Sequence, residues 1–250
     1  MTTNGELFEC KLLPVPSFRL GGLERVKTPM DPPPSYNDVA NPTIDDSRPH
    51  TPATFHILGS FIYSDRNPTG EPLYELSHQI GHLRDTTRSM SINRLDSTGR
   101  VQNGTSRMVT QKRHIYELKH PGILTGPLFL YHADSVSRYS LCSFGICTVR
   151  ARRFFSSAQG FQVHRAVKDA DDDVVPRGHL FSVASTKRGE VRFEWSDPGG
   201  DIIARELDSP LAKHSLLITM EMNEMARDAL VTAWVLRVWW QIARSPRYEL

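Results

Sequence analysis

Apolar residues surround a predicted helix in the last part of the chain. From Asn223 to Arg244 the sequence reads NEMARDALVTAWVLRVWWQIAR, without proline or glycine, and Asn223 is a residue type favoured at a helix N-cap. The apolar positions are Ala226, Ala229, Leu230, Ala233, Trp234, Val235, Leu236, Val238, Trp239, Trp240, Ile242 and Ala243. They leave no wide polar face, and such a helix is either buried on every side or inserted in lipid.

The polar residues within this helix favour burial in protein over lipid. Asp228, Arg237 and Gln241 interrupt the apolar run, and the longest uncharged stretch is Ala229 to Leu236. That stretch is far shorter than the roughly 18–20 residues that a membrane span needs. We therefore expect a core helix enclosed by sheet.

The part of the chain before this helix shows the period of two that is typical of strands. In Glu190–Ser196, Val191, Phe193 and Trp195 share one face, and Pro198-Gly199-Gly200 follows as a turn signal. The other predicted strands are Phe55–Tyr63, Leu73–Ile80, Ile115–Leu118, Leu128–His132, Ile146–Phe154, Phe161–Val167, Asp201–Leu207 and His214–Met220. In the first of these, the predicted apolar face carries Phe55, Ile57, Phe61 and Tyr63.

Many short strands separated by turns indicate a sandwich or a barrel. A wide barrel must enclose something, because the side chains of its wall cannot fill it. An all-apolar helix needs burial on every side, and the inside of a barrel provides it. The terminal helix is therefore the expected filling of a barrel.

Proline content divides the chain near residue 54. Nine of the 17 prolines lie at or before Pro52, in a region with little periodic apolar pattern. Such a region cannot repay the entropy of ordering, so we expect residues 1–54 to be a disordered, proline-rich tail and residues 55–250 to be the barrel domain.

This tail contains a Pro-Pro-x-Tyr motif. Pro33, Pro34 and Tyr36 match the pattern that WW domains bind. Consecutive prolines preform a polyproline II helix, so binding costs little further ordering, and Tyr36 fits a pocket beside the proline groove. The alternative is a proline spacer with an incidental tyrosine.

Composition and charge match a protein of a reducing compartment. The net charge of +2 is nearly neutral and favours neither nucleic acid nor a strongly acidic partner. The three cysteines are odd in number and form no CxxC motif, and no apolar secretion segment follows Met1. We therefore expect a cytoplasmic protein, with a peripheral position at a membrane as the alternative.

The order of segments near the C-terminus resembles a known fold. Glu190–Trp195, a glycine turn, Asp201–Glu206 and the apolar helix are similar to the tubby C-terminal-like fold, whose superfamily includes tubby proteins, phospholipid scramblases and LURP-one-related proteins. Four segments are similar to an uncharacterised filamentous-fungal group carrying this domain: Phe55–Gly59, Leu73–Ser77, Arg113–Pro121 and Asp228–Trp234.

The resemblance spans about Phe55 to Arg247. It implies an α+β, mainly β fold: a closed antiparallel β-barrel of about twelve strands around a hydrophobic, central C-terminal helix. It transfers no functional residue. The fungal group has no established active site, and the lysine and arginine pocket with which tubby proteins bind phosphoinositides has no residue-by-residue match here.

One basic cluster is a candidate site for anionic phospholipid. Arg150, Arg152 and Arg153 lie beside Phe154 and Phe155, so the arginines can bind lipid phosphate while the rings enter the interface. The alternative is a strand with arginines on its wet face, because Arg150 and Arg152 share one face.

Motifs for metals, cofactors and catalysis have no support. The acidic run Asp169–Asp173 lacks the glycine and the terminal glutamate of a calcium loop. His78 and His82 have the histidine spacing of zinc proteases but not their glutamate. Without a nucleotide-binding glycine motif or a nucleophile elbow either, we expect no cofactor, no metal and no enzyme activity.

We therefore expect a non-enzymatic intracellular adaptor, most simply a monomer. Its tail presents Pro33, Pro34 and Tyr36 to a WW-domain protein, for which a ubiquitin ligase is the leading class. The first alternative is a peripheral membrane protein that binds anionic phospholipid headgroups through Arg150, Arg152 and Arg153. The second is a scramblase-like lipid transporter.

Overall fold

The structure is a computed structural model of the chain. It describes residues 52–67, 70–102, 105–120, 129–150, 159–170, 173–186, 189–208 and 214–244, with the side chains at 98–102, 105–108, 150 and 159 excepted.

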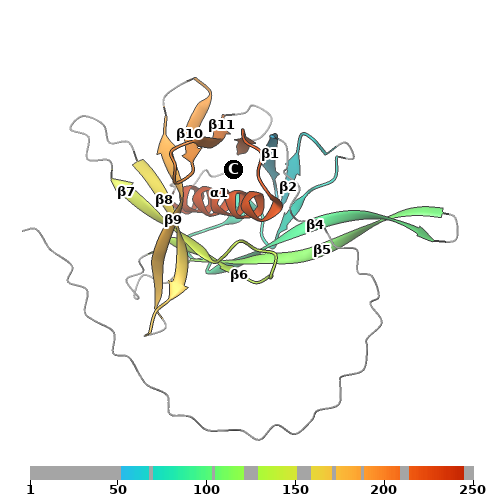
Figure 1. The fold of residues 1–250 in the computed structure, drawn as a ribbon, viewed down its shortest axis with the longest axis horizontal. Helices are drawn as coiled ribbons and strands as arrows, with labels where there is room; N and C mark the ends of the chain where they lie inside the picture. The colour runs from blue at the N-terminus through green and yellow to red at the C-terminus, as the bar shows by residue number, and fades with distance from the viewer. Residues whose placement is uncertain are drawn as a thin grey trace, which may run out of the picture. The chain divides into compact units, whose positions relative to one another are not determined.

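Twelve strands and a helix make up the described part (Figure 1). The strands are β1 (Ala53–Leu58), β2 (Phe61–Ser64), β3 (Tyr74–Leu76), β4 (Ser89–Gln102), β5 (Thr105–Lys119), β6 (Tyr131–Ser135), β7 (Phe144–Arg150), β8 (Gln159–Lys168), β9 (Val174–Ser185), β10 (Val191–Ser196), β11 (Ile202–Leu207) and β12 (Ser215–Ile218). A 3₁₀ turn, η1 (Ile80–His82), follows β3, and α1 (Glu224–Arg244) follows β12.

The strands form a closed antiparallel barrel in which each strand lies beside its neighbours in the chain. The ring closes where β1 pairs with β12, with Phe55 opposite Leu216 and Ala53 opposite Ile218. Closure pairs the first strand with the last, so the sheet ends on no open edge strand.

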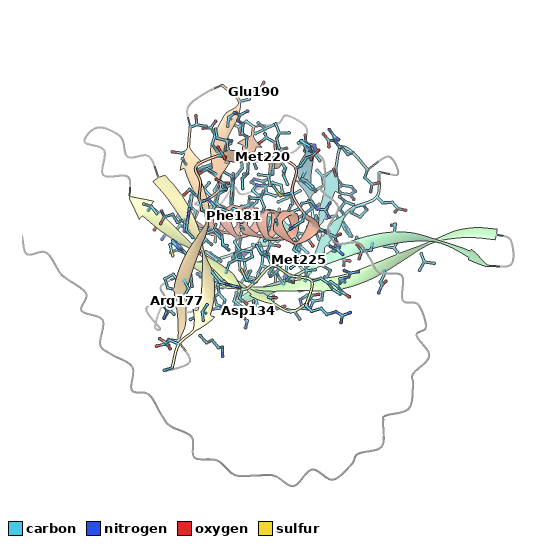
Figure 2. The ribbon with its side chains drawn as sticks, viewed as in Figure 1. Asp134, Arg177, Phe181, Glu190, Met220 and Met225 are labelled. Carbon is cyan, nitrogen blue, oxygen red and sulfur yellow. The ribbon has the colours of Figure 1, made fainter. Side chains whose placement is uncertain are left out.

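The inner wall is built from positions two residues apart, as strand geometry requires. Buried pairs of this kind are Phe55 and Ile57, Tyr74 and Leu76, Met90 and Ile92, Tyr116 and Leu118, Tyr131 and Ala133, Phe144 and Ile146, Phe161 and Val163, Phe181 and Val183, and Leu216 and Ile218. Side chains fill the space between this wall and α1 (Figure 2).

The helix α1 occupies the inside of the barrel, as the apolar pattern predicts. Every residue from Asp228 to Trp240 is buried, including the three tryptophans of the helix. Asn223 caps α1, because its Oδ1 accepts a hydrogen bond from the backbone N–H of Ala226 at 2.8 Å. No helix among the described residues has the length and hydropathy to cross a bilayer. The predicted fold, a barrel around a buried C-terminal helix, is confirmed.

The first predicted strand, Phe55–Tyr63, is wrong in two respects. It is two strands, β1 and β2, joined by a turn at Gly59, whose φ of 65° belongs to the left-handed region. The turn also changes which residues face inward. Ile62 is fully buried, whereas Phe61 and Tyr63 are only partly buried.

Five further differences separate the sequence predictions from the structure. Leu73–Ile80 is predicted as one strand, but β3 ends at Leu76, and Ile80 begins η1. The predictions contain no strand for β4 or for β9. Leu128–His132 and Ile146–Phe154 overlap β6 and β7, with boundaries that differ by several residues.

Candidate functional site

The predicted partner-binding residues lie outside the part that the structure describes. This holds for Pro33, Pro34 and Tyr36 of the motif and for Arg152 and Arg153 of the basic cluster. Arg150 is the last residue of β7, and its backbone pairs with that of Gln159, the first residue of β8.

The densest group of polar side chains among the described residues surrounds the beginning of α1. We call it the N-terminal ionic cluster, and it consists of Tyr74, Arg94, Asp96, Arg113, Glu224, Arg227 and Asp228. Three guanidinium groups face three carboxylates in it. Strands β3, β4 and β5 contribute four of the residues, and α1 contributes three.

Asp228 is a fully buried member of the cluster, with a relative exposure of 0%. Its Oδ1 accepts a hydrogen bond from the Tyr74 hydroxyl at 2.6 Å, and its Oδ2 accepts one from Arg94 Nη1 at 3.0 Å. Arg227 Nε donates to the Tyr74 hydroxyl at 3.2 Å. A buried carboxylate needs such partners, because an unpaired one is costly in an apolar interior.

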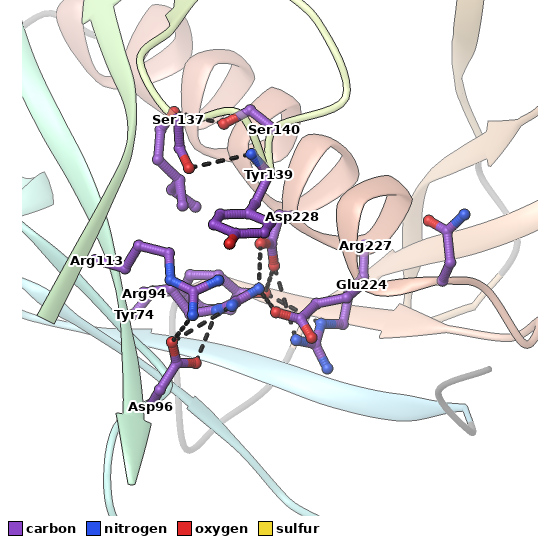
Figure 3. Close-up of polar contacts among 12 residues, drawn as sticks. Tyr74, Arg94, Asp96, Arg113, Ser137, Tyr139, Ser140, Glu224, Arg227 and Asp228 are labelled. Atoms are coloured by element: carbon purple, nitrogen blue, oxygen red, sulfur yellow. Dashed lines mark hydrogen bonds and ion pairs between the residues drawn. The ribbon is translucent and has the colours of Figure 1, made fainter. Parts of the chain in front are cut away.

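Arg94 joins the helix to the wall. Figure 3 shows its guanidinium between Asp96, two residues along β4, and Asp228 on α1. Arg94 Nε lies 2.8 Å from Asp96 Oδ1, and Arg94 also forms an ion pair with Glu224. On the neighbouring strand, Arg113 Nη2 lies 3.2 Å from Asp96 Oδ2.

The cluster continues toward the surface at the turn after β6. The guanidinium of Arg113 lies 4.7 Å from the centre of the Tyr139 ring, and that of Arg138 lies 4.8 Å from it. Both distances are within the range of a cation–π interaction. The ring therefore extends the cluster from the buried carboxylate of Asp228 to an exposed arginine.

The surroundings of Tyr74 and Arg94 set the charge states of these two members of the cluster. Burial raises the pKa of Tyr74, and the nearby Asp228 carboxylate adds to this, so the hydroxyl stays protonated and donates. Burial alone lowers the pKa of Arg94, but the carboxylates of Asp228 and Asp96 outweigh it and the net pKa is raised. These groups hold their charge states near neutral pH, and their chemistry is that of an anchor for α1.

A second buried group lies further along α1. We call it the Glu206 cluster, which consists of Trp195 on β10, Glu206 on β11, and Arg237 and Gln241 on α1. Arg237 pairs with Glu206, and Trp195 Nε1 donates to Glu206 Oε1 at 3.0 Å. Arg237 Nη1 donates to Gln241 Oε1 at 2.8 Å.

Desolvation dominates the electrostatics of the Glu206 cluster. Glu206 and Arg237 are 4% and 1% exposed. Burial raises the pKa of the Glu206 carboxyl, and the positive charge of Arg237 offsets part of this rise. Burial lowers the pKa of Arg237, with Glu206 acting against it. The two groups compensate each other in a site that neither could occupy alone.

An aromatic group lies beside the last turns of α1. The rings of His120 and Tyr131 stack with centres 4.4 Å apart, and the Tyr131 ring lies 4.8 Å from that of Trp239. Burial lowers the pKa of His120 and raises that of Tyr131 to about 12. Both side chains are therefore favoured in their neutral forms within this contact.

Thiols and metal ligands add no reactive centre to the described residues. Cys142 and Cys147 are half-buried, and burial raises the pKa of both thiols, which disfavours the reactive thiolate. No group of three or more histidine, cysteine or carboxylate side chains is arranged for a metal ion in this part of the chain.

The sequence predictions missed the two ionic clusters, although one signal was present. Asp228 and Arg237 interrupt a helix that is otherwise apolar on every side. Burial of such a helix requires an oppositely charged partner for each of them in the wall. The partners Arg94 and Glu206 are far away in the sequence, and no local pattern marks them.

No protein-family model, curated protein or solved structure matches this chain.

Proposed function

We propose that the chain is a non-enzymatic intracellular adaptor whose barrel is a filled scaffold and whose N-terminal region binds WW domains. Membership of the tubby C-terminal-like superfamily is part of this proposal. The observation that carries it is the burial of α1 from Asp228 to Trp240 inside the closed barrel.

The filled interior directs recognition to the outside of the molecule. Barrels that bind small ligands hold them in an interior left open by the wall. Here α1 occupies that space, and the charged groups within it are paired with one another in the N-terminal ionic cluster and the Glu206 cluster. Contacts with partners are thus left to the outer surface, the loops and the N-terminal region.

The Pro-Pro-x-Tyr motif supplies a specific means of recognition. Pro33, Pro34 and Tyr36 are the three fixed positions of the pattern, whereas Ser35 occupies its open position. WW domains of ubiquitin ligases are the proposed partners, which would make the barrel the part that is brought to the ligase.

A binding experiment with paired variants tests this proposal. Full-length wild type, Tyr36→Ala and Ser35→Ala are titrated with isolated WW domains taken from ubiquitin ligases. We expect Tyr36→Ala to weaken binding at least about tenfold, a loss of about 1.4 kcal/mol. Ser35→Ala is the matched control and should bind like the wild type. Equal binding by Tyr36→Ala and the wild type contradicts the adaptor proposal.

A peripheral membrane protein is the second candidate function. The supporting observation is the position of Arg150, which is the last residue of β7 and stands two residues before Arg152 in the sequence. Val149, just before them, is an exposed apolar residue with a relative exposure of 36%. Arginines that follow an exposed apolar residue in the sequence suit an anionic lipid interface.

Liposome sedimentation distinguishes this second candidate from the first. The variant Arg150→Gln, Arg152→Gln, Arg153→Gln should lose sedimentation with phosphoinositide-containing vesicles at low salt. A control with the same charge change, Arg84→Gln, Arg88→Gln, Arg138→Gln, alters exposed arginines elsewhere and should still sediment. Equal sedimentation of the wild type with neutral and anionic vesicles removes the lipid candidate.

A further inference from the structure

The two ionic clusters contact α1 at opposite faces. Asp228 and Arg237 are nine residues apart, which corresponds to about 2.5 turns, so their side chains leave the helix about 180° apart. The same spacing places them about 13 Å apart along the helix axis. Both residues are at most 1% exposed.

Their partners lie on opposite sides of the ring. Asp228 contacts Tyr74 on β3 and Arg94 on β4, whereas Arg237 contacts Glu206 on β11, next to Trp195 on β10. In the order of the barrel, β5 to β9 separate the two strand pairs on one side, and β12, β1 and β2 separate them on the other. The helix is therefore held between two facing walls.

The two contacts also differ in the sign of their charges. The helix supplies a carboxylate to the first contact and a guanidinium to the second, and the wall supplies the opposite charge in each case. A shift of α1 by one residue would rotate both side chains by about 100° and move them about 1.5 Å. The ion pairs Asp228–Arg94 and Arg237–Glu206, which join the helix to the wall, would then be broken at once, and breaking a buried ion pair is costly.

Apolar packing by itself distinguishes poorly between the native register of α1 and a shifted one. Because α1 is apolar on nearly every side, a rotated helix still presents apolar residues to an apolar wall. Buried ion pairs contribute little net stability compared with apolar side chains of similar volume, and specifying a register is their best-attested use.

We propose that Asp228 and Arg237 are a two-point register lock, which admits α1 into the barrel in one rotation and at one depth. The two ion pairs raise the free energy of states in which α1 sits in a wrong register. They add little to the stability of the native state. The register lock goes beyond the proposed adaptor function and is independent of it.

The tryptophans of the chain are natural probes of this lock. There are four of them: Trp195 on β10, and Trp234, Trp239 and Trp240 on α1. When the full-length protein is labelled with 5-fluorotryptophan, a helix in one register gives one fluorine resonance for each tryptophan. A helix in several registers gives additional resonances, above all from the three tryptophans of α1.

The first variant is Glu206→Gln with Arg237→Met, which removes both charges and leaves an oxygen acceptor for Trp195. We expect it to unfold cooperatively in urea, and to show more than four fluorine resonances. The matched control is Glu194→Gln with Arg205→Met. It makes the same changes in an ion pair of 3.4 Å between β10 and β11, the strands that carry Trp195 and Glu206, where the side chains of Glu194 and Arg205 are 25% and 40% exposed. The control should show four resonances.

A second variant covers the case in which the first does not fold. Asp228→Asn neutralises the other point while keeping the shape of the side chain and an acceptor for Tyr74. It too should give additional resonances from α1. If every variant that folds, whether changed at Asp228 or at Arg237, shows only four resonances, then packing alone sets the register and the proposal is wrong.

Discussion

Gly145 shows how a single side chain can be excluded by the packing of the barrel. It lies in β7, and a Cβ atom added to it would be 2.3 Å from the ring atoms Cγ and Cδ1 of Phe129. Phe129 is 2% exposed, so its ring has little room to move away. Glycine is therefore needed at residue 145 to leave space for the ring of Phe129, and not to allow an unusual backbone conformation.

Replacing Gly145 by alanine should destabilise the protein by about 1–3 kcal/mol, the usual cost of overpacking a core. Urea unfolding followed by tryptophan fluorescence measures the change. Gly81→Ala is the control, because an added Cβ there has no neighbour within 4 Å, and its effect should stay within about 0.5 kcal/mol. Equal unfolding midpoints for Gly145→Ala and the wild type would show that the ring of Phe129 does not need this space.

At the scale of elements, local pattern predicts α1 well and some strands not at all. The helix was predictable because its cap, Asn223, and its apolar surface are both local features. Strand β9 contains Pro176 and Gly178, which has a φ of 65°, so its sequence has the signals of a turn although both residues lie within the strand. Only pairing with β8, through register shifts near His164, makes this segment a strand.

The candidate site could be predicted only in part, because some of its residues are marked by local sequence pattern and others are not. The charges on α1 were visible in the sequence, whereas Arg94 lies in β4, a polar strand that the period of two did not detect. Glu206 lies in a predicted strand, but nothing local distinguishes it from a partly exposed glutamate such as Glu194. Contacts that depend on closure of the ring are long-range, and local patterns do not contain them.

The beginning of α1 offers a test at the scale of one element. Asn223→Ala removes the acceptor for the Ala226 N–H and should lower the free energy of unfolding by about 1 kcal/mol. Asn223→Ser keeps a capping oxygen and should stay close to the wild type. Urea unfolding of the three proteins measures the effect. A loss of stability that is equal in both variants would assign the effect to something other than the cap.

The whole molecule carries a pH dependence that follows from three partly buried histidines. Burial lowers the pKa of His120, His132 and His164. The unfolded chain, with histidine pKa values of about 6.5, therefore binds more protons than the folded protein as the pH falls. The stability from these groups is fully present above about pH 6.5, and it decreases as the pH falls toward their folded pKa values.

Replacing His120 by phenylalanine should reduce this dependence. The phenyl ring keeps the stack with Tyr131 and does not titrate. The urea midpoint of the wild type should be lower at pH 5.5 than at pH 7.5, and the difference should be smaller in His120→Phe. The raised pKa of Glu206 makes stability fall as the pH rises, which is opposite to the effect of the histidines. Both proteins contain Glu206, so its contribution cancels when their pH dependences are compared. His82→Phe, at an exposed histidine, is the control. If the urea midpoint of His120→Phe changes between the two pH values as much as that of the wild type, the prediction is wrong.

The position of α1 after every strand has a consequence for biosynthesis. A ribosome makes all twelve strands before it makes the element that fills them, so the growing chain cannot complete its interior until Arg244 has been translated. A stop codon placed between Ile218 and Glu224 would leave the sequence of every strand intact and remove α1, the helix that fills the barrel. Such a late truncation should therefore be as damaging as one in the middle of the gene.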